Sequence, residues 1–387
     1  MKAFLVKVRE KRAYYTELRI FLLKHPALVL LLGFRPAVCA DAPFGFDISK
    51  TVPSDRHLRR KLQELPNALL QSILQGTVKD LKQEVPHFGR RIALDNKHIY
   101  AWVKQNNKKT YVKNRYDPSS QPTGDPDCRL GAKETSNQDS GKANGKAQKE
   151  KEYVWGYGTS VVATKHRGLG EFVIAEHTEP FDVSDIAFFS TLMPTVEQRL
   201  GFRPKHFTAD AAYDAWYVYD YFAKVGGTAY VPINLRGHPL PRLGQNGFHI
   251  CEDEREMVGY SIYFDRTKGF WTQQEICPIL YGKLPDSQTC RINHTQFKKG
   301  KGCVKYHNLE RGARIRIEMD RTSRKFKRAY SWRTCDERIF SQAKEMGIER
   351  PRLRNLHSIR NQNTLIYIVI NAHALQRVKN AKQRKTN

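Results

Sequence analysis

Apolar residues recur at helical spacing over the first part of the chain. Ser54 can cap a helix whose apolar residues continue, three or four positions apart, as far as Leu74. A second, short helix is predicted over residues 78–85, because Pro86 ends it. We therefore predict a helical N-terminal region over residues 1–88. Its small basic helices suit contact with DNA, and a helical layer packed on the next domain is an equal alternative.

Short apolar runs bounded by turn residues predict strands in the next part of the chain. The predicted strands cover residues 90–95, 153–164, 172–177, 206–210 and 228–234, and the predicted helices cover residues 184–200 and 215–225. Residues 98–103 either continue the first strand or lead away from it. This order predicts an α/β fold, in which a mixed sheet carries helices on its faces. The sheet is expected within residues 89–234. Residues 117–151, rich in Pro, Ser, Gly, Asn and Lys, predict a mobile loop inside it.

The pattern changes again after the last of these strands. Gly, Pro and Cys become frequent over residues 235–321, and residues 313–319 alternate with a period of two, so a β-rich insertion is predicted. The core is expected to resume over residues 322–378 with two helices, the second strongly apolar. Residues 379–387 form a basic tail.

The strongly positive net charge of the chain limits the kinds of molecule that it is expected to bind. The chain has 387 residues and a formal net charge of +27, from 66 Lys and Arg against 39 Asp and Glu. Such an excess favours a polyanionic partner, most plausibly nucleic acid. A surface selected for solubility, or one that meets membranes, is the alternative.

Nothing in the sequence predicts a membrane span. The most apolar candidate, residues 18–34, is interrupted by Arg19, Lys24 and Pro26, so a helical hairpin around Pro26 is expected instead. Seven cysteines without a dense pairing pattern fit reduced thiols. We therefore expect a cytoplasmic protein.

One predicted helix carries an unusual polar stripe. Tyr330, Arg333, Glu337 and Lys344 fall within an arc of about 60° when residues advance by about 100° each. A stripe that faces a core would be apolar. This helix therefore faces either water or a ligand that needs a carboxylate flanked by cations.

Three carboxylates are candidates for catalysis. Asp95 and Asp210 each end a predicted strand, and Glu337 lies on the later helix. Strand ends and an adjoining helix meet in one crevice of an α/β sheet, where carboxylates would repel one another unless cations bound them. Two Mg²⁺ ions would suit this set, and Arg333 and Lys344 could grip phosphates. Taken singly, a strand-end Asp is often a cap and a helical Glu beside Arg is often a solvated ion pair.

The segment that leads into Glu337 is dense in Arg and Lys and interleaved with aromatic residues. Within it, Arg328, Tyr330 and Trp332 are candidates for DNA binding, because cations beside aromatic rings suit phosphate contacts and base stacking. A solvated charged face is the alternative.

The spacing Tyr-x2-Arg-x3-Glu-x6-Lys at Tyr330, Arg333, Glu337 and Lys344 resembles the signature helix of bacterial insertion-sequence transposases of the DDE superfamily. Further blocks of resemblance are residues 92–99, 208–214, 229–234 and 347–355. The resemblance implies an RNase H-like core with an Asp95, Asp210 and Glu337 triad, interrupted by a β-rich insertion. Tyr330 and Arg333 would hold distorted DNA, and Lys344 its backbone. Ala212 stands where many relatives carry Gly, a small change of little expected effect.

The same resemblance implies a function and its partners. The protein would cut double-stranded DNA at the terminal inverted repeats of its element, often through a hairpin, and join the 3′ ends to target DNA. It would use two Mg²⁺ ions, with Mn²⁺ as a substitute, and act as a homodimer in the synaptic complex. It would work in the bacterial cytoplasm, on the nucleoid when bound. The alternatives are an RNase H-like nuclease without strand transfer and an inactive DNA-binding remnant.

The insertion also contains candidate zinc ligands. They are Cys251, Cys277, Cys290 and Cys303, with His294 and His307 nearby. Their spacings are long and lack a Cys-x2-Cys pair, so free buried cysteines are the preferred interpretation and structural zinc the weaker one.

Overall fold

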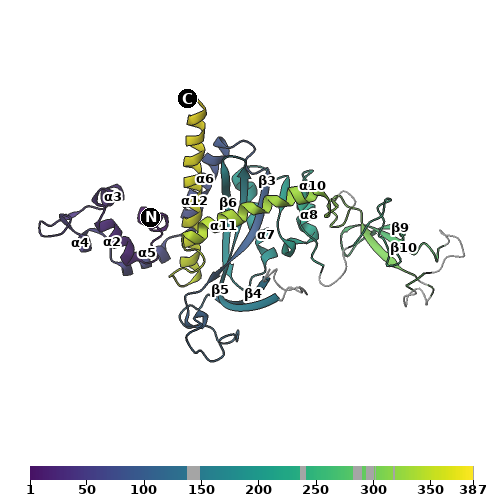
Figure 1. The fold of residues 1–387 in the computed structure, drawn as a ribbon, viewed down its shortest axis with the longest axis horizontal. Coiled ribbons are helices and arrows are strands. Elements are labelled where there is room, and N and C mark those ends of the chain that lie inside the picture. The colour runs from purple at the N-terminus through teal and green to yellow at the C-terminus, as the bar shows by residue number, and fades with distance from the viewer. Residues whose placement is uncertain are drawn as a thin grey trace, which may run out of the picture. The chain divides into compact units, whose positions relative to one another are not determined.

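The computed structural model describes residues 1–136, 149–235, 241–281, 290–292, 300, 302–316 and 319–386. The chain divides into two units (Figure 1). Unit 1 comprises Met1–Phe202 and Arg333–Asn387, and unit 2 comprises Arg203–Trp332. This boundary does not coincide with the domain boundaries predicted from the sequence, which stay a prediction.

Short helices form the N-terminal part of unit 1, as predicted. They are α1 (Lys2–Arg9), α2 (Tyr15–Leu23), α3 (Pro26–Leu31), α4 (Ile48–Thr51), α5 (Asp55–Glu64) and α6 (Asn67–Glu84), with a small pair of strands, β1 (Ala37–Val38) and β2 (Phe46–Asp47). Ser54 caps α5 by accepting a hydrogen bond from the His57 N–H at 3.3 Å. The predicted helix that follows Ser54 is split, because Pro66 directly precedes α6.

The helical hairpin expected around Pro26 is formed by α2 and α3. The short helix predicted over residues 78–85 is the last part of α6. Among the described residues, no helix is long and apolar enough to cross a membrane.

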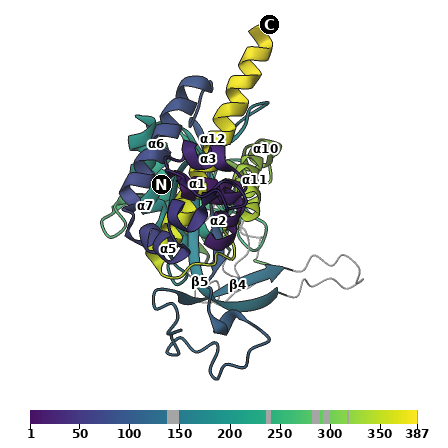
Figure 2. The ribbon, with the colours of Figure 1, turned by 90° about the vertical axis from the view of Figure 1, so that its left-hand side faces the viewer.

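The sheet of unit 1 is antiparallel. Its strands are β3 (Arg91–Tyr100), β4 (Arg129–Ser136), β5 (Lys149–His166) and β6 (Gly170–Pro180). β5 lies in the middle, with β3 on one side and β4 and β6 on the other. Figure 2 shows β4 and β5 side by side. The loop predicted over residues 117–151 is therefore wrong for β4 and for the start of β5, where charged residues continue a hairpin. Residues 137–148 of that prediction lie outside the described residues.

Helices cover both faces of this sheet. The Asn96 amide donates a hydrogen bond of 2.5 Å to Asp185, the first residue of α7 (Asp185–Leu200). Its neighbour Asp95 pairs instead with Arg333, which precedes α11 (Thr334–Glu345). Successive side chains of a strand point to opposite faces. α7 and α11 therefore lie on opposite faces, as predicted for the core.

The long helix α12 (Leu356–Thr386) packs against β6 and α6, with a row of polar side chains in the contact (Figure 1). The Asn363 amide donates to Thr178 Oγ1 at 2.9 Å, and the Thr364 hydroxyl donates to Glu176 at 2.6 Å. The Asn371 amide donates to the Val173 carbonyl and accepts from its N–H, each at 2.9 Å. These buried groups are hydrogen-bonded, so they can be tolerated in an otherwise apolar contact.

Unit 2 holds a parallel strand pair and a separate antiparallel sheet. The parallel pair is β7 (His206–Thr208) and β8 (Thr228–Tyr230), connected through α8 (Trp216–Ala223). β9 (Val258–Asp265), β10 (Phe270–Ile276) and β11 (Val304–Asn308) pair in the order β11-β10-β9. These three strands lie in the predicted β-rich insertion. The alternating residues 313–316 do not form a strand, and residues 317–318 lie outside the described part.

Candidate active site

Asp95 lies in the middle of β3. The sequence predicted it at or near the end of a strand, with residues 98–103 either continuing that strand or leading away from it. The structure shows the continuation, and the strand end at Asp95 was wrong: β3 runs through Tyr100 by pairing with β5 as far as Gly156. The three residues directly after Asp95 are half-exposed and polar, so the apolar run that marked the start of the strand is interrupted there. Asp95 thus presents its carboxylate on the α11 face of the sheet.

The helix predicted through Tyr330 and Lys344 is interrupted. α10 (Arg324–Tyr330) ends, a 3-10 turn covers Ser331–Arg333, and α11 then begins at Thr334. The Ser331 hydroxyl donates to the Arg328 carbonyl at 2.8 Å and so competes with the backbone for that acceptor. The four residues predicted on one helix therefore lie on three consecutive elements: Tyr330 ends α10, Arg333 ends the 3-10 turn, and Glu337 and Lys344 share α11.

Arg333 brings two of the predicted catalytic carboxylates together. Its Nη1 lies 3.0 Å from Asp95 Oδ2, and its Nη2 lies 2.8 Å from Glu337 Oε1. The Arg333 side chain is 26% exposed, Asp95 is 17% exposed and Glu337 is 52% exposed. A guanidinium holds two carboxylates in a fixed geometry through its planar fork. The cluster is half-buried on the side of Asp95 and open to solvent on the side of Glu337.

Asp336 lies directly beside this cluster and was missed in the sequence. Its side chain is fully buried, and within the described part of the chain neither carboxylate oxygen has a hydrogen-bond partner. Burial, followed by the nearby charge of Asp95, raises its pKa well above the usual range. The sequence could not show that Asp336 is buried while Glu337 is exposed, because two adjacent acids on a helix differ only in the side of the helix on which they lie.

Lys344 lies on the same face of unit 1 in a second ion-paired group. Its Nζ is 3.3 Å from Glu349 Oε2, and Lys97 Nζ approaches Glu349 Oε1 at 3.8 Å. Lys97 shares the face of Asp95 because the two are separated by one residue in β3. Cations therefore lie on this face next to the Asp95, Arg333 and Glu337 cluster.

Asp210 belongs to unit 2 and is described within that unit. It follows β7 and caps the short 3-10 turn Ala211–Tyr213, where its Oδ1 accepts from the Ala212 N–H at 2.9 Å. Within unit 1 the structure brings Asp95, Arg333 and Glu337 together, and within unit 2 Asp210 lies on a half-exposed turn.

Asp214 anchors the segment that follows Asp210. Its fully buried carboxylate accepts from Arg314 Nε at 2.8 and 2.7 Å, from the Tyr219 hydroxyl at 2.7 Å and from the Asn234 N–H at 2.7 Å. The burial of Asp214 would raise its pKa, but these hydrogen bonds outweigh that effect and lower it. Sequence reasoning missed this role, because the Arg314 partner lies far along the chain.

The candidate DNA-binding residues of unit 2 lie on α10 and on the 3-10 turn that follows it. Arg328 is exposed, and Tyr330 is half-exposed with its ring stacked on Phe326 at 5.9 Å between centroids. Trp332 is also half-exposed. Arg324, Lys325 and Lys327 of the same helix are exposed as well. α10 therefore combines a cationic surface with an aromatic ring that is held from behind.

Comparison with known proteins gives one match. A family model described as a transposase DDE domain matches residues 116–372, more than half of the chain. No curated protein and no solved structure gave a significant match. Asp210 and Glu337 lie within the matched residues, and Asp95 lies before them. The strands and helices described above are consistent with the RNase H-like fold predicted for the core.

Proposed function

This chain belongs to the transposase DDE domain family, and on that premise we propose that it cleaves DNA at the ends of an insertion sequence and joins them to target DNA. The observation that carries the proposal is the Asp95, Arg333 and Glu337 cluster. Two carboxylates that are far apart in the sequence meet at one cation, on a chain of net charge +27.

Asp95, Asp210 and Glu337 are the residues that we propose hold two Mg²⁺ ions, with Mn²⁺ as a substitute. Carboxylate oxygens are the donors that these hard cations prefer. The donor set of unit 1 fits, because the two carboxylates of Asp95 and Glu337 carry more negative charge than the single guanidinium of Arg333 balances. Two such ions would activate a water or a 3′-hydroxyl and stabilise the leaving oxygen.

The other residues of the cluster orient the reactants. Arg333 fixes the orientation of both carboxylates, and its remaining donors can contact a phosphate beside the cut. Lys344, exposed on the same helix, can follow the DNA backbone. In the first step water attacks the phosphorus at the element end, and in the second the freed 3′-hydroxyl attacks target DNA. A hairpin intermediate is a secondary expectation.

We propose double-stranded DNA as the partner: the terminal inverted repeats of the element and the target. Two ends must be paired for joint insertion, so we propose a homodimer in the synaptic complex. The site of action would be the cytoplasm, on the nucleoid. Exposed cations and the Tyr330 ring on α10 support contact with DNA, with Trp332 as a second platform.

Substitutions on α10 are expected to distinguish the contribution of charge to DNA affinity from the contribution of base stacking. Arg328→Ala should weaken binding to DNA of any sequence and lower the salt slope of the affinity by about one, because one phosphate contact is lost. Tyr330→Ala should weaken binding by about 1–3 kcal/mol and leave the salt slope unchanged, because stacking releases no counter-ion. Affinity for element-end DNA at several salt concentrations measures both.

The exposed Lys224→Ala, in unit 2 but outside the segments expected to bind DNA, is a matched control of charge for these measurements. If it lowers the salt slope as much as Arg328→Ala, the α10 surface has no special role. If Tyr330→Ala changes the slope but not the affinity at low salt, Tyr330 does not act as a stacking platform.

Plasmid cleavage tests the function directly. Purified protein is incubated with a plasmid that carries the element's own ends, with Mg²⁺ or with EDTA, beside Asp210→Ala. We expect cuts at the ends and joined products that require Mg²⁺ and disappear in the variant. Cuts without joined products would establish the nuclease alternative. Tight binding without cuts in either protein would establish an inactive DNA-binding remnant.

A further inference from the structure

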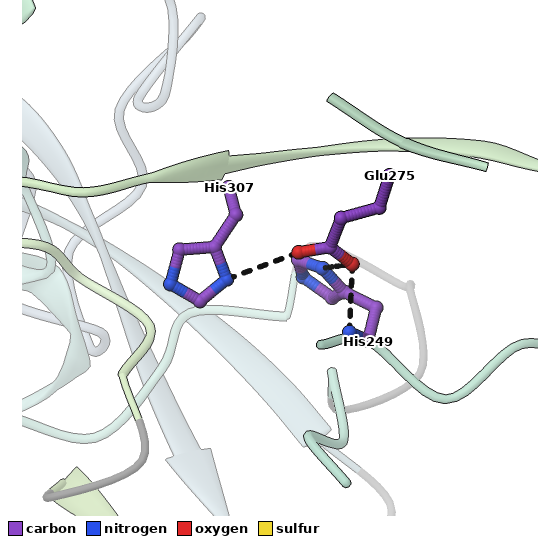
Figure 3. Close-up of side chains that lie close together, drawn as sticks. All are labelled: His249, Glu275 and His307. Carbon is purple, nitrogen blue, oxygen red and sulfur yellow. Dashed lines mark hydrogen bonds and ion pairs between the residues drawn. The ribbon is translucent and has the colours of Figure 1, made fainter. Parts of the chain in front are cut away.

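Three side chains that can ligate a metal meet in the β-rich part of unit 2, and none of them is a residue assigned to catalysis. Glu275 lies near the end of β10, His307 lies on β11, and His249 precedes β9. Figure 3 shows the Nδ1 side of each imidazole turned toward the Glu275 carboxylate. Within the described part of the chain, these three residues form the one group of His, Cys, Asp or Glu whose ligand atoms all lie within 4.8 Å of one another.

The strand register brings two of the three together. Glu275 pairs with Lys305, so the side chain of His307, two residues further on β11, lies on the same face of the ladder. His249 is fixed from a different segment. Its N–H donates to Glu275 Oε2 at 2.7 Å, and its carbonyl accepts from the Met257 N–H at 2.8 Å. Three separate segments of the chain thus place the ligand atoms of His249, Glu275 and His307 close to one another.

The distances are those of a coordination sphere. His249 Nδ1 lies 2.9 Å from Glu275 Oε2, and His307 Nδ1 lies 3.3 Å from Glu275 Oε1. Ligand atoms about 2.0–2.1 Å from a tetrahedral ion are separated from one another by roughly 3.3 Å. The angle between the two ring planes is 65°. The ligand atoms are therefore spaced closely enough to bind a single ion with little movement.

The buried carboxylate of Glu275 favours a bound cation, because water cannot solvate its charge. The Glu275 side chain is 0% exposed, and its two imidazole neighbours are 10% and 12% exposed. Oε1 of Glu275 is buried, and His307 Nδ1 lies 3.3 Å from it. A buried carboxylate is costly unless a cation or hydrogen-bond donors satisfy both of its oxygens. The two imidazoles are the nearest groups that can balance the charge of this buried carboxylate, and a cation bound between the three would do so directly.

A cavity leads to the ligands. It has a volume of about 480 Å³ and is lined by His249 and His307, with Trp216, Phe270, Tyr306 and Arg314 among its other walls. This volume leaves room for a water molecule as a fourth ligand. The four cysteines of the same region also lie near one another, since Cys251, Cys277 and Cys290 contribute, after burial, to the raised pKa of the Cys303 thiol. Among the described residues, however, the ligand atoms of His249, Glu275 and His307 are the ones that lie within 4.8 Å of one another.

We propose that His249, Glu275 and His307 bind one transition-metal ion of the zinc class, through both Nδ1 atoms and a carboxylate oxygen, with water completing the tetrahedron. Two imidazoles and one carboxylate suit Zn²⁺ rather than Mg²⁺. The ion ties the segment around His249 to β10 and β11, and so stabilises the β-rich part of unit 2. This site is additional to the carboxylates proposed for DNA cleavage.

Cobalt substitution tests the site in the full-length protein. The protein is stripped with a chelator, titrated with Co²⁺ and followed by absorption, and bound Zn²⁺ is counted by elemental analysis. We expect one ion per chain, weak visible bands and none of the intense near-ultraviolet absorption that cobalt–thiolate bonds produce. Zn²⁺ should also raise the thermal unfolding midpoint, because it binds only the folded protein.

His249→Gln, Glu275→Gln and His307→Gln should each weaken Co²⁺ binding by at least about tenfold, since even partners outside the coordination sphere contribute that much. His25→Gln, at an exposed histidine of unit 1, is the matched control and should bind as the unaltered protein does. Circular dichroism establishes that each variant folds. A parent protein without visible bands, three variants that bind normally, or a strong thiolate absorption that persists in them would each overturn the proposal.

Discussion

Asp95→Asn and Glu337→Gln are each expected to reduce cleavage at the element ends by on the order of 10³-fold or more, and to leave binding of the same DNA nearly unchanged. Each amide keeps the shape of the side chain but removes the negative charge that a divalent cation requires. The Arg333 contacts also lose their ionic character. Single-turnover cleavage at saturating protein, beside a filter-binding or anisotropy assay, separates the two effects.

The helix that carries Glu337 supplies two informative controls. Glu345→Gln removes an exposed carboxylate of α11 that pairs with Lys11 at 2.8 Å, and it should leave cleavage within about twofold, because exposed pairs contribute little. Asp336→Asn alters the buried neighbour. If Asp336→Asn stops cleavage and Glu337→Gln does not, the catalytic carboxylate has been misassigned by one residue. Equal losses in Glu345→Gln would show that the assay reports general damage to the helix.

Asp214→Ala is expected to lower the free energy of unfolding of unit 2 by about 3 kcal/mol. The substitution leaves the Tyr219 hydroxyl, the Asn234 N–H and the Arg314 guanidinium without their shared acceptor. The value lies at the lower end for a broken buried pair, because the Arg314 side chain is 36% exposed and can be solvated. Urea unfolding followed by tryptophan fluorescence measures the change.

Asp220→Ala is the matched control for Asp214→Ala. Asp220 pairs with Lys224 at 2.7 Å one helical turn away, and both side chains are partly exposed, so its loss should cost about 0.5 kcal/mol or less. Equal destabilisation by the two variants would show that Asp214 has no special role in unit 2.

The stability difference between the parent and Asp214→Ala should depend on pH. The folded pKa of Asp214 is lowered, so its contribution is fully present above the unfolded value of about 3.9 and is lost as the pH falls through the folded value. The difference should therefore be constant near neutral pH and shrink below about pH 4. A difference that grows on acidification would contradict this assignment of the pKa.

Local patterns predicted most of the elements because each pattern reports a face that is buried by its neighbours. The apolar spacing after Ser54 and the apolar run before Asp95 both correspond to observed elements. The same reasoning left open whether the strand continues past Asp95, since the second half of β3 is held largely by pairing with β5. It also joined α10 to α11, because a single 3-10 turn over Ser331–Arg333 leaves no mark in a hydrophobic pattern.

The partners of buried charges were the least predictable part. From the sequence alone, Asp214 would be expected on the surface, because its partner Arg314 lies 100 residues further along the chain. His249, Glu275 and His307 are spread over three segments, and only the register of β10 and β11 places them together. By contrast, Arg333 and Glu337 are one helical turn apart, so their contact could be expected from spacing alone.

The polar row on α12 has a consequence for the position of Glu337. A purely aliphatic helix can slide along a sheet at little cost, because one apolar contact replaces another. Displacement of α12 by one turn would instead leave Asn363, Thr364 and Asn371 facing the wrong strand atoms, with several buried hydrogen bonds lost at once. α11, the helix that bears Glu337, packs on α12 as well as on β3. The polar side chains of α12 therefore also fix the position of α11 along the sheet. A change at Asn371 can thus alter catalysis without contacting DNA, by letting that helix drift.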